Sequence, residues 1–382
     1  MPPTTLFEQL SRRLGEIGAQ PQDTGVVGRR YRCACGRPVF FRNSACLACG
    51  RALGYDCERG LVLALEPEPA PGLWREASGA ALYRRCANFD TAAGCNWLVP
   101  AADGGPARCV ACRLNRTIPD LGRDDNALLW QRIELAKRRV VSQLVLLGLP
   151  VRSRLGEDPQ RGLAFDLLRA PPGGRIVTGH EAGIVTLDIE EADDARREAV
   201  RAAMAEPYRT LLGHFRHEVG HYYWERLVRD THWLAPFRAL FGDERADYHA
   251  ALQANAAHGP REDWALGHVS GYASVHPWED WAETWAHYLH MVDVVHTAVG
   301  FGLDAGAIGA GGTPFDATAL WRPDDAQAQD FLRFVNAWVG LSCALNEMSH
   351  SMGQAEFYPF VLPRAAVAKL QLIHCVVRDA GA

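Results

Sequence analysis

Nine of the eleven cysteines in this 382-residue chain lie before residue 113, and no other feature constrains its fold as strongly. The first twenty residues hold no long apolar run, so we expect neither a secretory signal nor a disulfide framework. Cysteines grouped in this way favour bound zinc instead. The region also needs such a ligand, because about 120 turn-rich residues bury little core of their own.

The first cysteine group pairs Cys33 with Cys35 and, ten residues further on, Cys46 with Cys49. Each pair on a tight turn presents two thiolates, and two such turns complete a tetrahedral zinc site. A glycine follows each pair and lets the backbone curl so that amide groups face the sulfurs. The first pair is one residue shorter than the commoner C-x-x-C, so Cys57 stays an alternative to Cys33 or Cys35 as a ligand.

A second group ends in a C-x-x-C pair and consists of Cys86, Cys95, Cys109 and Cys112. The Pro-rich stretch 66–72 separates it from the first group, as a spacer would. We therefore predict a zinc ribbon over 1–65, a second four-cysteine module over 73–120 and a further domain over 121–382. The two zinc sites either only fold this region or also recruit a protein or nucleic-acid target.

The charge balance limits the partners of this chain. Its formal net charge is -5, and its isoelectric point is about 6.3. The first 120 residues carry 15 arginines and 11 acidic residues, a surplus too small for a strong nucleic-acid footprint. No window holds 18 uninterrupted apolar residues, so we expect no membrane contact and a cytoplasmic protein.

Beyond Asp124 the hydrophobic pattern changes from short β-like runs to the period of helices. A capping aspartate, first-turn prolines and a Gly-Leu-Pro stop predict helices over 124–147, 207–229, 277–297, 325–350 and 363–378. A strand is expected over 165–168, and turn residues between 175–180 and 183–189 suit a hairpin. The fold class is therefore α+β, with a zinc-ribbon region before a mainly helical domain that holds a small sheet.

One of these helices contains the motif that carries chemistry, His217-Glu218-Val219-Gly220-His221. Residues four apart share a helix face, so both imidazoles can reach one metal ion, and Glu218 beside them can take a proton from metal-bound water. Apolar neighbours predict a buried helix, in which two histidines and a glutamate are costly unless a metal or hydrogen bonds compensate. A helix whose histidines are only hydrogen-bonded is the alternative.

A catalytic zinc needs a third protein ligand and one open position. Glu279 and Glu283 are four residues apart in the first turns of the helix that starts at Pro277. We assign Glu279 as the ligand and Glu283 as the carboxylate that buttresses a histidine, since ligating imidazoles usually donate their other N–H to a carboxylate. The reverse assignment, with Glu283 as the ligand, stays open.

HExxH followed by E-x-x-x-E on a later helix resembles the gluzincin clan of zinc metallopeptidases. The E-x-x-A-E-x-[FW] form, here E279-D-W-A-E-T-W, is similar to the catalytic domain of anthrax lethal factor. A tyrosine seven residues before the ligand glutamate assists catalysis in that enzyme, and Tyr272 has this position here. The resemblance implies that Tyr272 donates a hydrogen bond to the developing oxyanion; the alternative is an aromatic residue that merely flanks the helix.

Over nearly its whole length the chain also resembles a bacterial family of zinc-binding metallopeptidases with an N-terminal zinc ribbon. FFRNSACLACG, EPYRTLLGHFRHEVGHYYW and HPWEDWAETWAHYLH carry this resemblance. It implies a gluzincin-like domain in which the strand GIVTLDI is an edge strand beside the cleft and pairs with extended substrate. The same alternation also suits an ordinary half-buried strand.

These residues predict a zinc endopeptidase that acts on a protein or peptide. Zinc held by His217, His221 and Glu279 would lower the pKa of its bound water, with Glu218 as general base. Counting ligands gives three zinc ions, one catalytic and two structural. The alternatives are a zinc-ribbon module that binds protein or nucleic acid on a protease-like scaffold, and a protease associated with nucleic acid.

Overall fold

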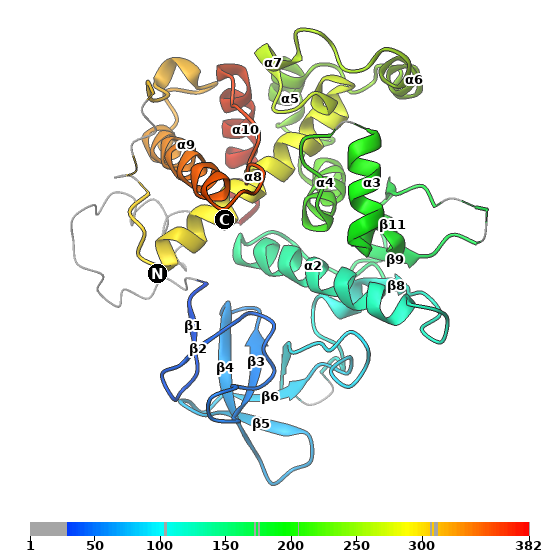
Figure 1. Cartoon of the computed structure of the whole chain (residues 1–382), viewed down its shortest axis with the longest axis vertical. Coiled ribbons are helices and arrows are strands. Elements are labelled where there is room, and N and C mark those ends of the chain that lie inside the picture. Colours follow the sequence, from blue (N-terminus) through cyan, green and yellow to red (C-terminus); the bar gives the residue numbers. More distant parts are fainter. Residues whose placement is uncertain are drawn as a thin grey trace. The chain divides into compact units, whose positions relative to one another are not determined.

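The computed structural model describes residues 29–102, 105–171, 173–174, 176–204, 206–305, 308 and 312–381. Internal contacts divide this chain into one compact unit within Gly25–Met204 and a second within Ala205–Ala382 (Figure 1). Each unit is described separately below. In the described part of the chain, no helix is long and apolar enough to cross a membrane.

The first unit begins with a strand-rich region. A short hairpin, β1 (Tyr31–Arg32) and β2 (Pro38–Val39), precedes a five-stranded antiparallel sheet in sequence order. The sheet consists of β3 (Ala52–Asp56), β4 (Leu61–Pro67), β5 (Leu73–Glu76), β6 (Leu82–Arg85) and β7 (Leu98–Pro100). Leu63, Leu65, Tyr83 and Leu98 form one buried cluster on it, because the apolar LVLAL run places its side chains in the core.

Strand pairing crosses the stretch that we expected to separate the two cysteine modules. β4 and β5 pair antiparallel from Leu65↔Glu76 to Pro67↔Trp74, so residues 68–72 are the turn of a hairpin. One sheet therefore connects the segment after the first cysteine group with the segment that carries the second. The division into domains at 1–65, 73–120 and 121–382 stays a prediction.

The rest of the first unit is a second, mixed sheet with helices. Its strands follow the order β10-β11-β9-β8. Their bounds are β8 (Asn115–Thr117), β9 (Ala164–Leu168), β10 (Gly179–Glu181) and β11 (Ile184–Asp188). The predicted long helix is α2 (Asn126–Leu146), and α3 (Asp194–Ala203) begins after Asp193, whose carboxylate accepts from two backbone N–H groups. The predicted hairpin is β10–β11.

The strand that we expected to offer a free edge is an inner strand. β11 pairs antiparallel with β10 on one side and parallel with β9 on the other. Ala182 and Gly183 at the hairpin turn both have positive φ, 48° and 85°, the geometry that folds two strands tightly together. The prediction that GIVTLDI pairs with extended substrate was therefore wrong, because β10 occupies the side that substrate would need.

The second unit is helical. Its elements are α4 (Leu211–Tyr223), the π-helix η3 (Trp224–Val228), α5 (Leu234–Phe241), α6 (Tyr248–His258), α7 (Trp264–Gly267), η4 (Tyr272–Ser274), α8 (Pro277–Gly300), η5 (Ala317–Ala319), α9 (Ala328–Ser351) and α10 (Arg364–Gly381). α8 packs against α4, α5, α9 and α10 and is the central helix of the unit. Strand-rich ribbon and helical domain together confirm the predicted α+β class.

The helix with the HExxH motif starts four residues later than Pro207 predicts. The Thr210 side chain accepts a hydrogen bond from the Gly213 N–H, so the threonine is the N-cap and α4 begins at Leu211. At its other end α4 passes into the π-helix η3 at Trp224. Pro277, by contrast, starts α8 as predicted, with His276 as N-cap.

Candidate metal centres

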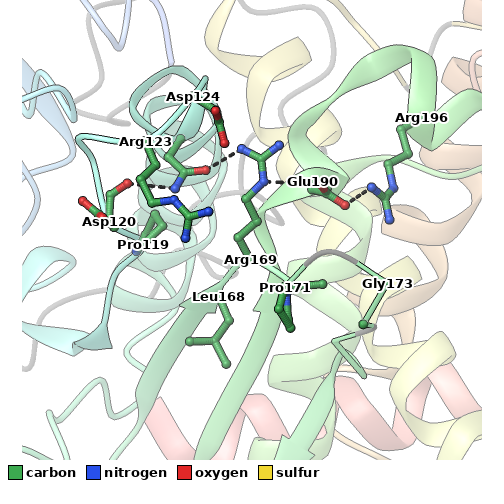
Figure 2. Close-up of a pocket in the computed structure, with 13 residues that line it drawn as sticks. Pro119, Asp120, Arg123, Asp124, Leu168, Arg169, Pro171, Gly173, Glu190 and Arg196 are labelled. Atoms are coloured by element: carbon green, nitrogen blue, oxygen red, sulfur yellow. Dashed lines mark hydrogen bonds and ion pairs between the residues drawn. The ribbon is translucent and has the colours of Figure 1, made fainter.

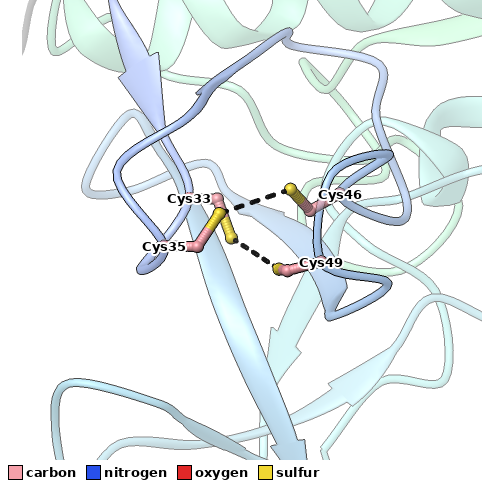
Figure 3. A group of neighbouring side chains, drawn as sticks. All are labelled: Cys33, Cys35, Cys46 and Cys49. Atoms are coloured by element: carbon pink, nitrogen blue, oxygen red, sulfur yellow. Dashed lines mark hydrogen bonds between the residues drawn. The ribbon is translucent and has the colours of Figure 1, made fainter.

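The four sulfur atoms of the first cysteine group converge on one point (Figure 3). All four lie within 4.8 Å of one another, and the Cys33–Cys49 and Cys35–Cys46 pairs are 3.7 and 3.8 Å apart. Sulfurs held tetrahedrally at about 2.3 Å from zinc lie roughly 3.8 Å from each other, so this group fits that ion. Cys57 is buried and belongs to neither four-cysteine group among the described residues.

The short C-x-C turn is compatible with this geometry because the backbone curls around the sulfurs. Gly36 and Gly50, which follow the two pairs, have φ of 83° and 73°. The backbone N–H groups of Cys49 and Ala48 face the Cys46 sulfur and lower the pKa of that thiol to about 7. These amides therefore favour the thiolate, which is the form that binds metal.

The second cysteine group is closed and buried. Its sulfurs also lie within 4.8 Å of one another, and all four residues are buried: Cys86, Cys95, Cys109 and Cys112. Lys137 and Arg138 of α2 are buried beside it, and Lys137 Nζ lies 2.6 Å from Glu134 Oε1. Burial opposes the charge of Arg138, but the attraction of Cys95, Glu134 and Cys112 outweighs it and raises the arginine pKa. These cations offset the negative charge of a zinc–tetrathiolate group.

The third group lies in the helical unit and joins α4 to α8. His217 and His221 are one turn apart on α4, with ring centroids 4.9 Å apart. Glu279 Oε2 lies 3.0 Å from His217 Nε2 and 3.6 Å from His221 Nε2. Its side chain is 1% exposed, and Oε2 has no hydrogen-bond partner among the described residues. A buried carboxylate oxygen that faces two imidazole nitrogens in this way fits a divalent cation between them.

Close packing of two helices brings these ligands together. A Cβ on Gly220 would meet Ala282 Cα at 3.1 Å and Trp285 Cδ1 at 3.2 Å, so a side chain here would press on α8 at the present spacing of the two helices. Trp281 Nε1 also donates to the Gly220 carbonyl over 3.0 Å. The glycine inside the HExxH motif therefore contributes to the close approach of the two helices that carry the histidines and the glutamate.

Glu283 lies one turn beyond Glu279 and contacts the other face of His217. Its Oε1 is 2.8 Å from His217 Nδ1, and its Oε2 accepts a hydrogen bond from Ser270 Oγ over 2.6 Å. A carboxylate on Nδ1 leaves Nε2 without its proton and directed at a metal. The structure thus brings Glu279 to both Nε2 atoms and Glu283 to Nδ1, the arrangement that the sequence predicts; their metal-binding roles stay predictions.

Tyr248 is a site residue that the sequence reasoning missed. It is the first residue of α6, and its hydroxyl donates to Glu279 Oε1 over 2.5 Å. One carboxylate oxygen is therefore held by the tyrosine while the other faces the histidines. His276 fixes this arrangement, because its ring caps α8 through the Trp278 N–H and reaches the Ala246 carbonyl.

Glu218 has one engaged and one unengaged carboxylate oxygen. His214 Nε2 lies 3.3 Å from its Oε1, while its buried Oε2 has no hydrogen-bond partner among the described residues. Burial opposes the charge of Glu218, but His214, His217 and His221 outweigh it and lower its pKa. The carboxylate is thus ionised, as a general base must be.

Three carboxylates around two imidazoles make this group electrically suited to a cation. Burial opposes the charge of Glu279, but His221 and His217 hold its pKa well below the usual range. Burial likewise disfavours a charged His217, yet Glu279 and Glu283 raise its pKa well above the usual range. In the absence of a cation, a protonated His217 must offset the negative charge of these carboxylates. A zinc ion would supply that positive charge instead.

Tyr272 lies at the mouth of the same group. It is in the short turn η4 before α8, is 38% exposed, and its ring centroid is 6.0 Å from that of His217. Burial and the charge of Glu279 raise the pKa of its hydroxyl, so it stays a protonated hydrogen-bond donor. Tyr272 thus lies near the candidate ligands, and its catalytic role stays a prediction.

A separate pocket of about 670 Å³ lies in the first unit, between the start of α2 and the end of β9 (Figure 2). Arg169 at its centre bonds to Asp125 and reaches Glu190, which also pairs with Arg196. These ion pairs neutralise the charges that an ionic ligand would need. No ligand of the three metal-binding groups lines this pocket, and we assign it no function.

Fold and site together define the class of this protein. It combines a region with two tetrathiolate groups and a helical domain in which an HExxH helix meets a distant glutamate. The chain belongs to the family described as "Putative zinc-binding metallo-peptidase", whose model matches residues 126–376, and residues 30–123 match a zinc-ribbon domain. The resemblance to a bacterial family of zinc-binding metallopeptidases with an N-terminal zinc ribbon is thereby confirmed.

Relatives of this chain occur in mycobacteria. Uncharacterized proteins of Mycobacterium bovis and of two strains of Mycobacterium tuberculosis are each 42% identical to it over 353 residues. The aligned part covers 92% of this chain and 96% of each relative. No solved structure matches the chain.

Proposed function

We propose that this chain is a zinc-dependent endopeptidase that hydrolyses peptide bonds of a protein substrate. One observation carries the proposal: Glu279 Oε2 faces the Nε2 atoms of both histidines beside an ionised Glu218. These are the three ligands and the base of a gluzincin-type hydrolase. A protease-like scaffold without activity would be expected to lack one of them, and all four are present.

His217, His221 and Glu279 would hold the ion, which when bound supplies a Lewis acid for the scissile carbonyl and a more acidic water. Glu218 takes the proton of the attacking water on its unengaged Oε2 and returns it to the leaving amine nitrogen. His214 positions this carboxylate through Oε1. Tyr272 donates its hydroxyl hydrogen to the oxygen on which negative charge develops.

The proposal includes three zinc ions per chain, with different duties. The two cysteine groups offer four thiolates each and leave no vacant position, so they are structural. The histidine–glutamate group offers three ligands and is catalytic. The proposal also includes a reducing compartment such as the cytoplasm as the place of action, because thiolates that bind zinc must stay reduced.

Metal content and proteolysis, measured together, test this function. We expect about three zinc ions per chain in both the natural protein and Glu218→Gln, because the amide removes the base and no ligand. New N-termini generated in a proteome incubated with the natural protein should be absent with Glu218→Gln. Loss of the general base should reduce cleavage by at least about a hundredfold.

Glu225→Gln is the matched control. This glutamate lies in η3, just past the motif helix, and its carboxylate pairs with Arg229. Glu225→Gln should therefore keep the natural cleavage pattern. Equal cleavage by Glu218→Gln and the natural protein would show that Glu218 is not the general base. A content of only two zinc ions would show that the histidine–glutamate group binds no metal.

A further inference from the structure

The first zinc knuckle, residues 29–51, carries a concentrated positive charge. The segment has six arginines and no acidic residue. Five of the arginines are exposed: Arg30, Arg32, Arg37, Arg42 and Arg51. A zinc ion with four thiolates has two net negative charges, so the loaded knuckle keeps a charge of about +4. The small net positive charge of the first 120 residues does not reveal this local concentration of arginines.

In the described part of the chain, the exposed arginines of this segment have no carboxylate partner. Among the described residues, none of the five exposed arginines forms an ion pair, and Arg32 donates only to the Gly36 carbonyl. Of the acidic side chains that follow the knuckle, Asp56 accepts a hydrogen bond from the Tyr83 hydroxyl, and three glutamates of the five-stranded sheet are engaged with other arginines. Glu76 pairs with Arg59, and Arg75 binds two further glutamates of the β4–β5 hairpin. The knuckle is therefore free to bind an anionic partner.

Two large apolar side chains project from the same segment. Phe40 is 69% exposed and Leu47 is 97% exposed. Phe41, by contrast, is buried against Tyr55, with ring centroids 4.6 Å apart. The turn at Phe40 is fixed, since the Asn43 side chain accepts from its N–H over 2.6 Å. An aromatic ring is thus held outward within two residues of the Arg42 guanidinium.

We propose that the first zinc knuckle binds single-stranded nucleic acid. Guanidinium groups match phosphate oxygens in pairs, and an exposed ring stacks on an unpaired base of any identity. An acidic protein segment would meet the same arginines but has no base to stack on Phe40. A duplex hides its base faces, so the ring favours a single strand. This inference is independent of the proteolytic function.

The test uses the zinc-loaded full chain and a fluorescent oligothymidylate of about 20 nucleotides. If four or five arginines each neutralise one phosphate, log affinity should fall with log salt with a slope of about -3. The affinity then drops roughly 60-fold between 50 and 200 mM salt. Fluorescence anisotropy across this range gives both the dissociation constant and the slope.

Replacing Arg30, Arg37, Arg42 and Arg51 with alanine should weaken binding by well over tenfold and reduce the slope to between 0 and about -0.7. Phe40→Leu should weaken it about tenfold with the slope unchanged, because stacking involves no counterions. The matched control replaces four exposed arginines that do pair with carboxylates, namely Arg245, Arg261, Arg333 and Arg364. It changes the net charge equally and should bind like the natural protein.

Several results would overturn the proposal: no binding at 50 mM salt, equal loss in the control, or equally effective competition by polyglutamate of matched charge. The last would indicate an acidic protein partner instead. Zinc content reports whether the quadruple variant keeps its knuckle. If that variant loses zinc, the single substitutions Arg37→Ala, Arg42→Ala and Arg51→Ala decide the matter, since each should reduce the slope by about 0.7.

Discussion

The cysteine groups and the histidine–glutamate group each bring candidate metal ligands together, but they differ in the number and type of those ligands. In all three the candidate ligand atoms lie within 4.8 Å of one another. Each cysteine group closes with four thiolates from loops and turns, so a zinc there has no vacant position. The third group has three ligands on two helices, with Glu218 unengaged on one oxygen beside them. The cysteine groups are therefore typical of structural zinc sites, whereas the third group is typical of a catalytic one.

The two kinds of site also differ in what assembles them. The first cysteine group spans only the stretch from Cys33 to Cys49, so local turns suffice to close it. The histidines and Glu279 are 58 residues apart at the nearer histidine, and packing of α4 on α8 brings them together. We therefore expect removal of a cysteine to affect folding and removal of a histidine-site residue to affect activity.

The largest effect is expected for Cys95→Ser. A structural zinc contributes on the order of 10 kcal/mol to the folding of a small region with little core. Loss of one buried thiolate should release one zinc and make residues 29–123 sensitive to proteolysis, while the helical unit keeps its zinc. Zinc content and limited proteolysis report both. Cys343→Ser, an exposed cysteine outside the metal groups, is the control, and an intact ribbon in Cys95→Ser would contradict a structural role.

Glu279→Gln and Glu283→Gln should separate the two glutamates. The first removes a ligand, so we expect loss of one zinc and at least about a thousandfold lower cleavage with both ribbons intact. The second removes only the partner of His217, so zinc affinity should fall by about 10- to 100-fold. Zinc titration with a competing chelator measures both, and the opposite ranking would make Glu283 the ligand.

Tyr248→Phe tests whether the tyrosine orients Glu279. Deleting the hydroxyl leaves Oε1 without its hydrogen bond, so zinc affinity at the third group should fall by about tenfold. Tyr83→Phe removes an equivalent hydroxyl–carboxylate bond, to Asp56 in the other unit, and should leave that affinity unchanged. Equal affinities in the two variants would show that Tyr248 does not position the ligand.

Gly220→Ala should weaken zinc binding by several-fold. Alanine favours a helix by about 1 kcal/mol over glycine, so a purely local effect would stabilise α4. Here the added methyl group presses on Ala282 and Trp285 and separates the two helices that hold the ligands. Gly267→Ala has open space around the new methyl group and serves as control. Unchanged zinc affinity in Gly220→Ala would show that the helices can adjust.

The smallest effect concerns pH and is confined to the helical unit. Burial, aided by Arg378, lowers the pKa of His374 to about 3, so this histidine stays neutral in the fold. Because its pKa is about 6.5 when unfolded, its contribution to stability is complete above that pH and declines as the pH falls towards 3. The decline should be up to about 1.4 kcal/mol per pH unit.

Urea unfolding followed by helical circular dichroism between pH 7.5 and 5.5 measures this dependence. His374→Gln should reduce the dependence of the free energy of unfolding on pH by the contribution of one proton. Buried His287, whose pKa is lowered to about 4, makes a similar contribution that the variant retains. An unchanged slope in His374→Gln would mean that this histidine is not protonated on unfolding.

Much of the fold followed from local signals. Pro277 and the apolar period predicted α8 closely, and turn residues predicted the β10–β11 hairpin. The sequence misplaced the start of α4 because Thr210, not Pro207, caps it. The resemblance to gluzincins implied that β11 is an edge strand, and the sequence offered no check, since the period of a strand reveals which face is buried but never which neighbours pair with it.

The partners of the two lysines could also not be predicted from the sequence. Lys137 and Lys369 are the only lysines among the 40 basic residues of the sequence. Both are buried, and each lies 2.6 Å from a carboxylate oxygen, of Glu134 and Asp280 respectively. Lys369 also donates to the Gly267 carbonyl and so ties the segment before η4 to α8. No pattern along the chain indicated these partners.

The sequence by itself determined the kinds of metal site, because the spacing of ligands on one turn or one helix is a property of neighbouring residues. C-x-C, C-x-x-C and HExxH each fix which side chains share a face before any packing occurs. Only the tertiary structure decided which oxygen faces which nitrogen. Tyr248 on Glu279 and Ser270 on Glu283 come from other segments, and hydrogen bonds between distant segments form only after α4 and α8 have packed.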